Sequence, residues 1–192
     1  MKPRILCYGD SNTYGYDPRS YLGGRYPASV RWTALLRAAG WEVLNHGQNG
    51  RRLPRTAQEA EEEARLLQAL QAEWTIVMLG SNDLLQGLSA EACEARMEAL
   101  LRALGTGGRL LLAAPPPMVP GPWAEDRQVR EESRRLGPCY QALAERLEGV
   151  AFADAGAWGV ELSYDGVHFS EAGHRAFAAG MAAALEELFQ DD

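Results

Sequence analysis

Short apolar runs alternate with longer amphipathic segments along the chain. A short apolar run between turn residues is typical of a buried parallel strand, whereas apolar residues three and four positions apart predict a helix. Five runs predict strands, and they lie at residues 5–8, 41–44, 74–79, 110–114 and 150–153. Five amphipathic segments predict helices, and they lie at residues 30–39, 58–71, 89–104, 131–147 and 170–188.

The alternation of strands and helices predicts a parallel sheet covered on both faces. Right-handed crossovers then give an α/β fold of three layers, α/β/α, for which we expect the doubly wound strand order 2-1-3-4-5. No repeat or low-complexity segment divides the sequence, so residues 1–192 are predicted to form one domain. Irregular segments at residues 17–29 and 115–126 follow strand ends, and Pro138 is expected to kink or restart the fourth helix.

Composition narrows the classes of function. The net charge of −7 and the scattered arginines disfavour a nucleic-acid partner, because phosphate contacts need clustered Lys and Arg. No apolar run approaches the ~20 residues that span a bilayer, and no secretory signal is evident, so we expect a cytoplasmic protein without membrane association. The three cysteines, Cys7, Cys93 and Cys139, lack CxxC spacing and are predicted to be small buried hydrophobes.

One polar residue stands out directly after the first predicted strand. Gly9 and Asp10 favour a tight turn there, and Ser11 follows them. In open α/β sheets, ligands bind beyond the carboxyl ends of the strands. A serine at that edge is a candidate nucleophile if a base can reach its hydroxyl, and its alternative role is to cap the following helix.

Three further polar motifs also follow predicted strands. Gly47 follows the second predicted strand, and Asn82 follows the third. Asp165 and His168 lie between the fifth predicted strand and the last predicted helix. Because a parallel sheet brings these strand ends to one edge, we expect these residues to meet Ser11 in one cleft.

The side-chain types in this set predict acyl-transfer chemistry. His168 can take the Ser11 proton as general base, and Asp165 can hold the imidazole in the tautomer that leaves Nε2 free. The oxyanion of a tetrahedral intermediate needs hydrogen-bond donors. We expect the backbone N–H groups of Ser11 and Gly47 and the side-chain amide of Asn82 to supply them.

These motifs resemble the four sequence blocks of the SGNH (GDSL-type) hydrolases, particularly the arylesterase and acyltransferase branch. The matching blocks are Gly9-Asp10-Ser11-Asn12-Thr13, Gly47, Gly80-Ser81-Asn82-Asp83 and Asp165-Gly166-Val167-His168. The resemblance implies a flavodoxin-like fold, a Ser-His-Asp triad, an acyl-enzyme intermediate and no metal or cofactor. It also implies hydrolysis of small acyl esters, acyl transfer to another acceptor, and a homo-oligomer.

Several residues are expected to shape the substrate pocket of such an esterase. Asn12 stands where many family members have leucine, and Tyr14 and Tyr16 follow it closely. The candidates are Asn12, Tyr14, Tyr16, Met118, Trp123 and Val167. The natural acyl group stays open: a carbohydrate O-deacetylase, a lysophospholipase or a thioesterase would use the same triad, and a binding module without turnover is the alternative outside the enzymes.

The remaining polar residues near these motifs have ordinary structural explanations. His46 and His174 match no zinc-ligand spacing, so His46 is expected to make local contacts and His174 to lie on a helix surface. Asp10 is expected to fix the turn before Ser11, with hydrogen bonds to the backbone around the site as the alternative. The pair Arg51 and Arg52 is interpreted as solvated or as holding a neighbouring loop, with an anionic substrate as the alternative.

Overall fold

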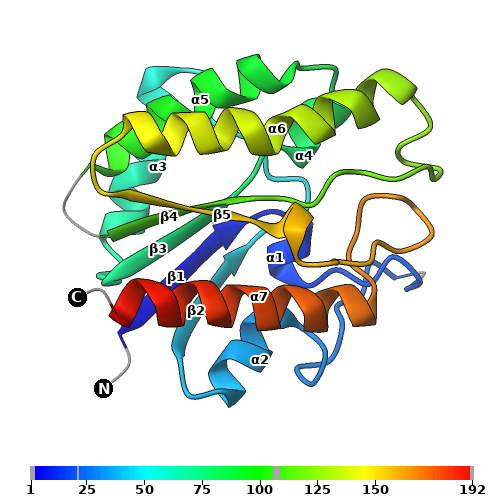
Figure 1. The fold of residues 1–192 in the computed structure, drawn as a ribbon, viewed down its shortest axis with the longest axis horizontal. Helices are drawn as coiled ribbons and strands as arrows, with labels where there is room; N and C mark the ends of the chain where they lie inside the picture. The colour runs from blue at the N-terminus through cyan, green and yellow to red at the C-terminus, as the bar shows by residue number, and fades with distance from the viewer. Residues whose placement is uncertain (1–2, 21, 106–108, 191–192) are drawn as a thin grey trace.

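A five-stranded parallel sheet in the order β2-β1-β3-β4-β5 forms the middle layer of the molecule, as Figure 1 shows. The computed structural model describes residues 3–20, 22–105 and 109–190. Every neighbouring pair of strands is parallel, and Gly9 at the end of β1 pairs with Gly47 at the end of β2. The strands are β1 (Arg4–Gly9), β2 (Glu42–Gly47), β3 (Trp74–Met78), β4 (Arg109–Ala114) and β5 (Val150–Asp154).

Helices cover both faces of this sheet (Figure 1). One face packs under α3 (Ala57–Gln68), α5 (Ala90–Leu104) and α6 (Arg127–Arg146), and the other under α2 (Trp32–Ala38) and α7 (Glu171–Gln190). Short helical segments follow strand ends, and they are α1 (Ser11–Tyr14), α4 (Ser81–Leu85) and the 3-10 turn Ala155–Ala157.

Alternation along β1 divides the core into two clusters. Leu6 and Tyr8 face the layer of α3, α5 and α6, whereas Ile5 and Cys7 face α2 and α7. All four side chains are buried, as expected for a central strand covered on both faces. The sheet is therefore a rigid platform from which the segments after the strands extend.

The fold class and the strand order 2-1-3-4-5 are confirmed, and each predicted strand and long helix is present within a few residues. Ser89 caps α5, since its hydroxyl accepts the N–H of Ala92 at 3.2 Å. The restart predicted at Pro138 is wrong, because α6 continues through that residue. Buried Leu136 and Tyr140 on either side of Pro138 hold both halves of α6 against the core.

Two smaller features differ from prediction. Cys7 and Cys93 are buried as expected, but Cys139 is only half-buried at the rim of α6. The short helices α1 and α4 were not predicted, because four or five residues are too few to show helical periodicity. No helix within the described parts of the chain is both long and apolar enough to cross a membrane.

Candidate active site

Ser11 is the first residue of α1, immediately after β1 ends. Asp10 caps this helix, since its Oδ1 accepts the N–H of Asn12 at 2.9 Å, and Gly15 ends it in the left-handed conformation. The structural role expected for Asp10 thus matches the geometry. Burial raises the pKa of Asp10 to about 6, against the hydrogen bond from Asn12 and the charges of His168 and Arg51.

The loop before α7 brings Asp165 and His168 to Ser11. Nε2 of His168 lies 3.0 Å from the Ser11 hydroxyl oxygen, and Nδ1 of the same ring lies 2.6 Å from Asp165 Oδ2. Ser11 is 6% exposed, His168 3% and Asp165 0%. Hydroxyl, imidazole and carboxylate therefore form one buried hydrogen-bonded line, and they come from segments 157 residues apart.

The second oxygen of Asp165 fixes the local backbone. Oδ1 accepts the N–H groups of Val167 at 3.0 Å and of His168 at 2.9 Å. Burial opposes ionisation of this carboxyl, but the hydrogen bonds from the His168 ring and from both N–H groups outweigh it and lower the pKa of Asp165. The carboxylate form is the one that orients a neutral histidine with its proton on Nδ1.

Asn82 lies in α4, after the end of β3, and its amide nitrogen donates to the carbonyl of Arg51 at 3.0 Å. An amide has two N–H donors, so one remains for a ligand. This bond ties α4 to the turn after β2. Asp83 strengthens the same junction, since its buried carboxylate accepts from the Leu53 N–H and from Arg96.

The expected oxyanion role of Gly47 does not agree with the geometry. The Gly47 N–H donates to its neighbour Asn45 Oδ1 at 2.9 Å, so this donor is already occupied. Glycine is needed here for another reason: a Cβ would lie 2.6 Å from Tyr14 Cα in α1. Gly47 therefore permits β2 and α1 to approach closely.

Two other N–H groups in the turn after β2 remain available. The N–H of Gln48 donates to Gly9, and that of Arg51 donates to Gln48. The N–H groups of Asn49 and Gly50 make no hydrogen bond within the described residues. The Asn-Gly pair is itself a turn signal, and Gly50 has a φ of 73°. The Asn-Gly pair was therefore the feature of the sequence that could have identified the free N–H groups of this turn.

Arg51 holds the ends of the first two strands together. Its Nη1 donates to the carbonyl of Gly9 at 2.8 Å and also to that of His46, and its guanidinium lies 4.4 Å from the centre of the Tyr8 ring. His46 accordingly makes local contacts, as expected. These bonds occupy Arg51, which agrees with its interpretation as a loop-holding residue.

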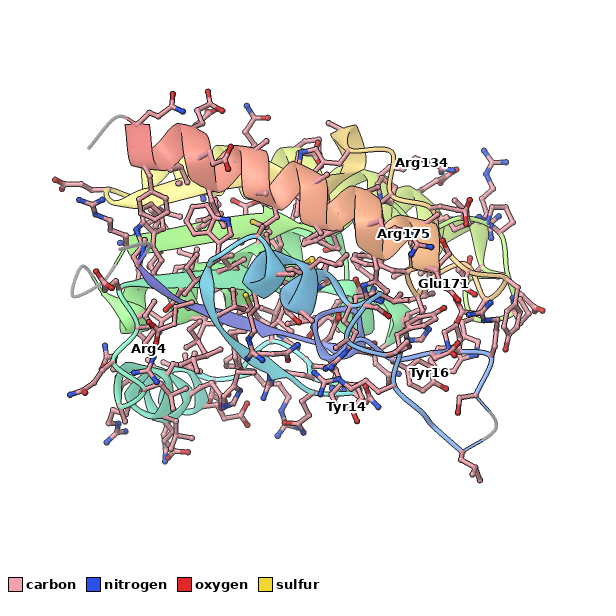
Figure 2. All side chains as sticks on the ribbon, turned by 90° about the horizontal axis from the view of Figure 1, so that it is seen from below. Arg4, Tyr14, Tyr16, Arg134, Glu171 and Arg175 are labelled. Atoms are coloured by element: carbon pink, nitrogen blue, oxygen red, sulfur yellow. The ribbon has the colours of Figure 1, made fainter. Side chains whose placement is uncertain are left out.

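Aromatic rings flank the imidazole of His168. The Tyr16 ring centre lies 4.7 Å from it, and the Trp123 ring lies at 5.0 Å, nearly perpendicular to it. Trp123 is 53% exposed, and its backbone N–H donates to the Asp165 carbonyl. Both residues border the site, as the sequence suggested. Figure 2 shows Tyr16 at the same end of the molecule as Glu171, where α7 begins.

The other predicted pocket residues have different surroundings. Met118 and Val167 are buried in the core cluster under α6. The Arg25 guanidinium covers the ring of Tyr14 at 4.5 Å and also donates to the Tyr14 carbonyl. Asn12 is 3% exposed, and its amide bonds to backbone in the His168 loop rather than facing open space.

His174 is not on a helix surface, as was expected, but completely buried. Its ring packs edge-on against Tyr26 at 5.2 Å and Phe169 at 5.3 Å. The first turn of α7 points inward at this position because Phe169 and Phe177 lie on the same side. Burial, with the nearby charges of Arg31 and His168, lowers the pKa of His174 to about 3.

A cavity of about 420 Å³ lies between α3 and the turn after β2. Its walls carry both signs of charge, and none of Ser11, Asp165 and His168 lines it. Within the described ranges, no group of three or more His, Cys, Asp or Glu side chains is arranged to hold a metal ion. The polar geometry at Ser11, rather than cavity size, marks the candidate site.

Comparisons with known proteins identify the family of this chain. The model of the GDSL-like lipase/acylhydrolase family matches residues 7–176. A search of curated proteins found no match. Among solved structures, an arylesterase candidate from Agrobacterium tumefaciens str. C58 is 32% identical, with a TM-score of 0.82 over 97% of this chain and 99% of that one.

Two other solved structures are similar over nearly their full lengths. The native aryl esterase of M. smegmatis is 28% identical, with a TM-score of 0.83 over 98% of this chain and 100% of that one. A carbohydrate acetylesterase from Sinorhizobium meliloti is 26% identical, with a TM-score of 0.81 over 97% and 100%. The match of the family model across most of the chain, together with these neighbours, shows that this protein belongs to the GDSL-like lipase/acylhydrolase family and is a carboxylic ester hydrolase with the SGNH fold.

Proposed function

We propose that this protein hydrolyses small acyl esters through a Ser11-His168-Asp165 triad and an acyl-enzyme intermediate. The observation that carries the proposal is the continuous line of hydrogen bonds, 3.0 Å from Ser11 to His168 and 2.6 Å from His168 to Asp165. In this arrangement the base is within reach of the nucleophile, and the base is oriented by a third group.

In the first half-reaction, the Ser11 oxygen attacks the ester carbonyl while its proton passes to His168 Nε2. Collapse of the tetrahedral intermediate breaks the bond to the alcohol, which leaves with that proton. Asp165 stays ionised, consistent with its lowered pKa, and stabilises the imidazolium. Water then attacks the acyl-enzyme and gives a proton to His168. Collapse of the second tetrahedral intermediate breaks the bond to Ser11 Oγ, which takes that proton back from His168, and the acid is released.

Three donors are proposed for the oxyanion: the Ser11 N–H, the free N–H of the Asn82 amide, and a backbone N–H at Asn49 or Gly50. The last replaces Gly47, whose N–H is bound to Asn45. Support comes from the bond between Asn82 and the Arg51 carbonyl, which places the turn after β2 beside α4. Donors fixed in this way need no reorganisation as charge develops on the oxyanion.

The rings of Tyr16 and Trp123 beside His168 favour a compact, partly aromatic site for the ester. An alcohol can replace water as the nucleophile that attacks the acyl-enzyme, so acyl transfer to an added alcohol is a second outcome of the same chemistry. The likeness to a carbohydrate acetylesterase makes an acetylated sugar the alternative substrate.

The test of the triad is covalent labelling. The protein is incubated with an organophosphonate that carries an activated leaving group, and the modified peptide is identified by mass spectrometry. Label is expected on Ser11 and is expected to be absent from Ser11→Ala, with the circular dichroism spectrum and Tm of the variant unchanged. Label on another residue would overturn the assignment.

The substrate range is tested separately with matched ester panels. Initial rates are compared for p-nitrophenyl esters of increasing acyl length and for acetylated sugars, with and without an added alcohol. Short acyl chains are expected to give the highest kcat/KM, and ester product is expected when alcohol is present. A strong preference for acetylated sugars would favour the deacetylase alternative, and a preference for long chains would exclude a small-acyl substrate.

A further inference from the structure

The side chain of Asn12 joins the helix of the nucleophile to both peptide bonds that flank His168. Its amide nitrogen donates to the carbonyl of Val167 at 3.2 Å, and its amide oxygen accepts the N–H of Phe169 at 2.9 Å. Both bonds are buried and span 155 and 157 positions of the chain. Asn12 thus binds the backbone immediately before and immediately after the histidine.

The other backbone bonds of this loop do not reach α1. The N–H groups of Val167 and His168 donate to Asp165, and the His168 carbonyl accepts the N–H of Ser163 at 2.6 Å. These bonds define the shape of the loop and the direction of the ring within it. Among the bonds made by residues 165–169 in the described structure, the two from Asn12 join the loop to α1, besides the bond from His168 to Ser11 itself.

Asn12 is itself rigidly held. Its N–H donates to Asp10 Oδ1, its carbonyl accepts from the indole N–H of Trp32 at 3.0 Å, and it is 3% exposed. It is also the direct neighbour of Ser11. Any displacement of the loop from Asn12 therefore changes the separation between the His168 ring and the Ser11 oxygen.

We propose that Asn12 is a positioning residue, which sets the distance from Ser11 Oγ to His168 Nε2 by holding the peptides on both sides of the histidine. The proposal rests on the proposed triad function. Its role differs from that of Asp165, which orients the ring within the loop, because Asn12 fixes the loop relative to the nucleophile. The amide carries its donor and its acceptor on two separate atoms, so this one side chain can bind both peptides at once.

Two variants at position 12 and one neighbouring control test this role. Asn12→Leu has the same number of side-chain heavy atoms, with the same branching, and removes both bonds, whereas Asn12→Asp keeps the acceptor for Phe169 and loses the donor for Val167. Thr13→Val is the control, because Thr13 is equally buried in α1 and its hydroxyl has no partner among the described residues. Kinetics with p-nitrophenyl acetate, the rate of phosphonate labelling and Tm are measured for all three variants.

Loss of positioning is expected to reduce kcat of Asn12→Leu by about 10- to 100-fold with a much smaller change in KM. The rate of phosphonate labelling falls in parallel, because it needs the same base. The low-field proton resonance of the Asp165–His168 bond is expected to persist, since that bond lies within the loop. In Asn12→Asp, the added charge beside the imidazole moves the acid limb of the pH profile to higher pH. Thr13→Val retains wild-type kinetics.

Equal kcat in Asn12→Leu and Thr13→Val would overturn the proposal. So would loss of the low-field resonance together with a large fall in Tm, because that pattern indicates general structural damage. If Asn12→Leu does not fold, the kcat and pH profile of Asn12→Asp decide: an unshifted profile with wild-type kcat refutes the role. Failure of the proposed function itself is distinguishable, because it would appear as absent Ser11 labelling in the wild-type protein.

Discussion

One carboxylate, that of Asp165, holds both the ring and the backbone of His168. Oδ2 lies 2.6 Å from Nδ1 of the ring, and Oδ1 lies 2.9 Å from the N–H of the same histidine. A spacing of three residues in a tight loop makes both contacts possible at once. The orientation of the imidazole is therefore a property of the short segment from Asp165 to His168, and its distance from Ser11 is set by how that segment docks on α1.

Asp165→Asn tests this orienting role. The Asn oxygen is expected to accept the two backbone N–H groups, which leaves its NH₂ facing His168 Nδ1. The ring must then carry its proton on Nε2 and cannot accept the Ser11 proton. We expect kcat for p-nitrophenyl acetate to fall about 1,000- to 10,000-fold while Tm changes little. A decrease of less than tenfold would contradict the assigned tautomer.

Asn82→Ala tests the side-chain donor of the proposed oxyanion site. Removing one such donor typically costs about 100- to 1,000-fold in turnover. Because the donor acts on charge that develops after binding, kcat is expected to fall much more than KM rises. Unchanged kcat would remove Asn82 from the site, and Tm separates this effect from loss of the bond to Arg51.

Gly47→Ala and Gly50→Ala form a matched pair in one turn. A Cβ at Gly47 would collide with the backbone of Tyr14, and we expect a loss of stability of about 3 kcal/mol or more, with displacement of α1 and lower activity. A Cβ added at Gly50 would have no atom of the described residues within 4 Å, apart from its chain neighbours. The only cost of Gly50→Ala is therefore that of a left-handed backbone at a residue with a side chain, about 1 kcal/mol of stability. Urea unfolding measures both, and equal destabilisation would contradict the close approach at Gly47.

His174→Phe tests the pH dependence of stability. In the folded protein the pKa of His174 is about 3, below its ordinary value of 6.5, so between these two pH values the unfolded chain binds a proton that the folded one does not. The contribution of neutral His174 to the free energy of unfolding is fully present above pH 6.5. It is lost as the pH falls from 6.5 toward 3, by up to about 1.4 kcal/mol per pH unit.

The phenylalanine variant keeps an aromatic ring between Tyr26 and Phe169 but cannot be protonated. Its unfolding free energy should therefore decrease less between pH 7 and pH 4 than that of the wild-type protein, as measured by urea denaturation at several pH values. Identical pH slopes in the two proteins would show that His174 does not titrate in this way.

The sequence by itself determined the fold class and the places where polar residues leave the sheet, whereas the strand order was an expectation chosen among the doubly wound orders. Short apolar runs and helical spacing are local signals, and right-handed crossovers leave few topologies for five parallel strands. Ser11, Asn82, Asp165 and His168 were identified because each follows a strand, and parallel strands end at one edge.

Tertiary structure alone decided which polar groups are already occupied. The N–H of Gly47 is bound to Asn45, the amide of Asn12 to the His168 loop, and His174 lies among aromatic rings rather than in solvent. Each of these outcomes depends on a neighbour or an orientation that no local pattern encodes. The residue type fixes how many hydrogen bonds a polar group can donate and accept, but which group becomes its partner depends on how distant segments of the chain pack together.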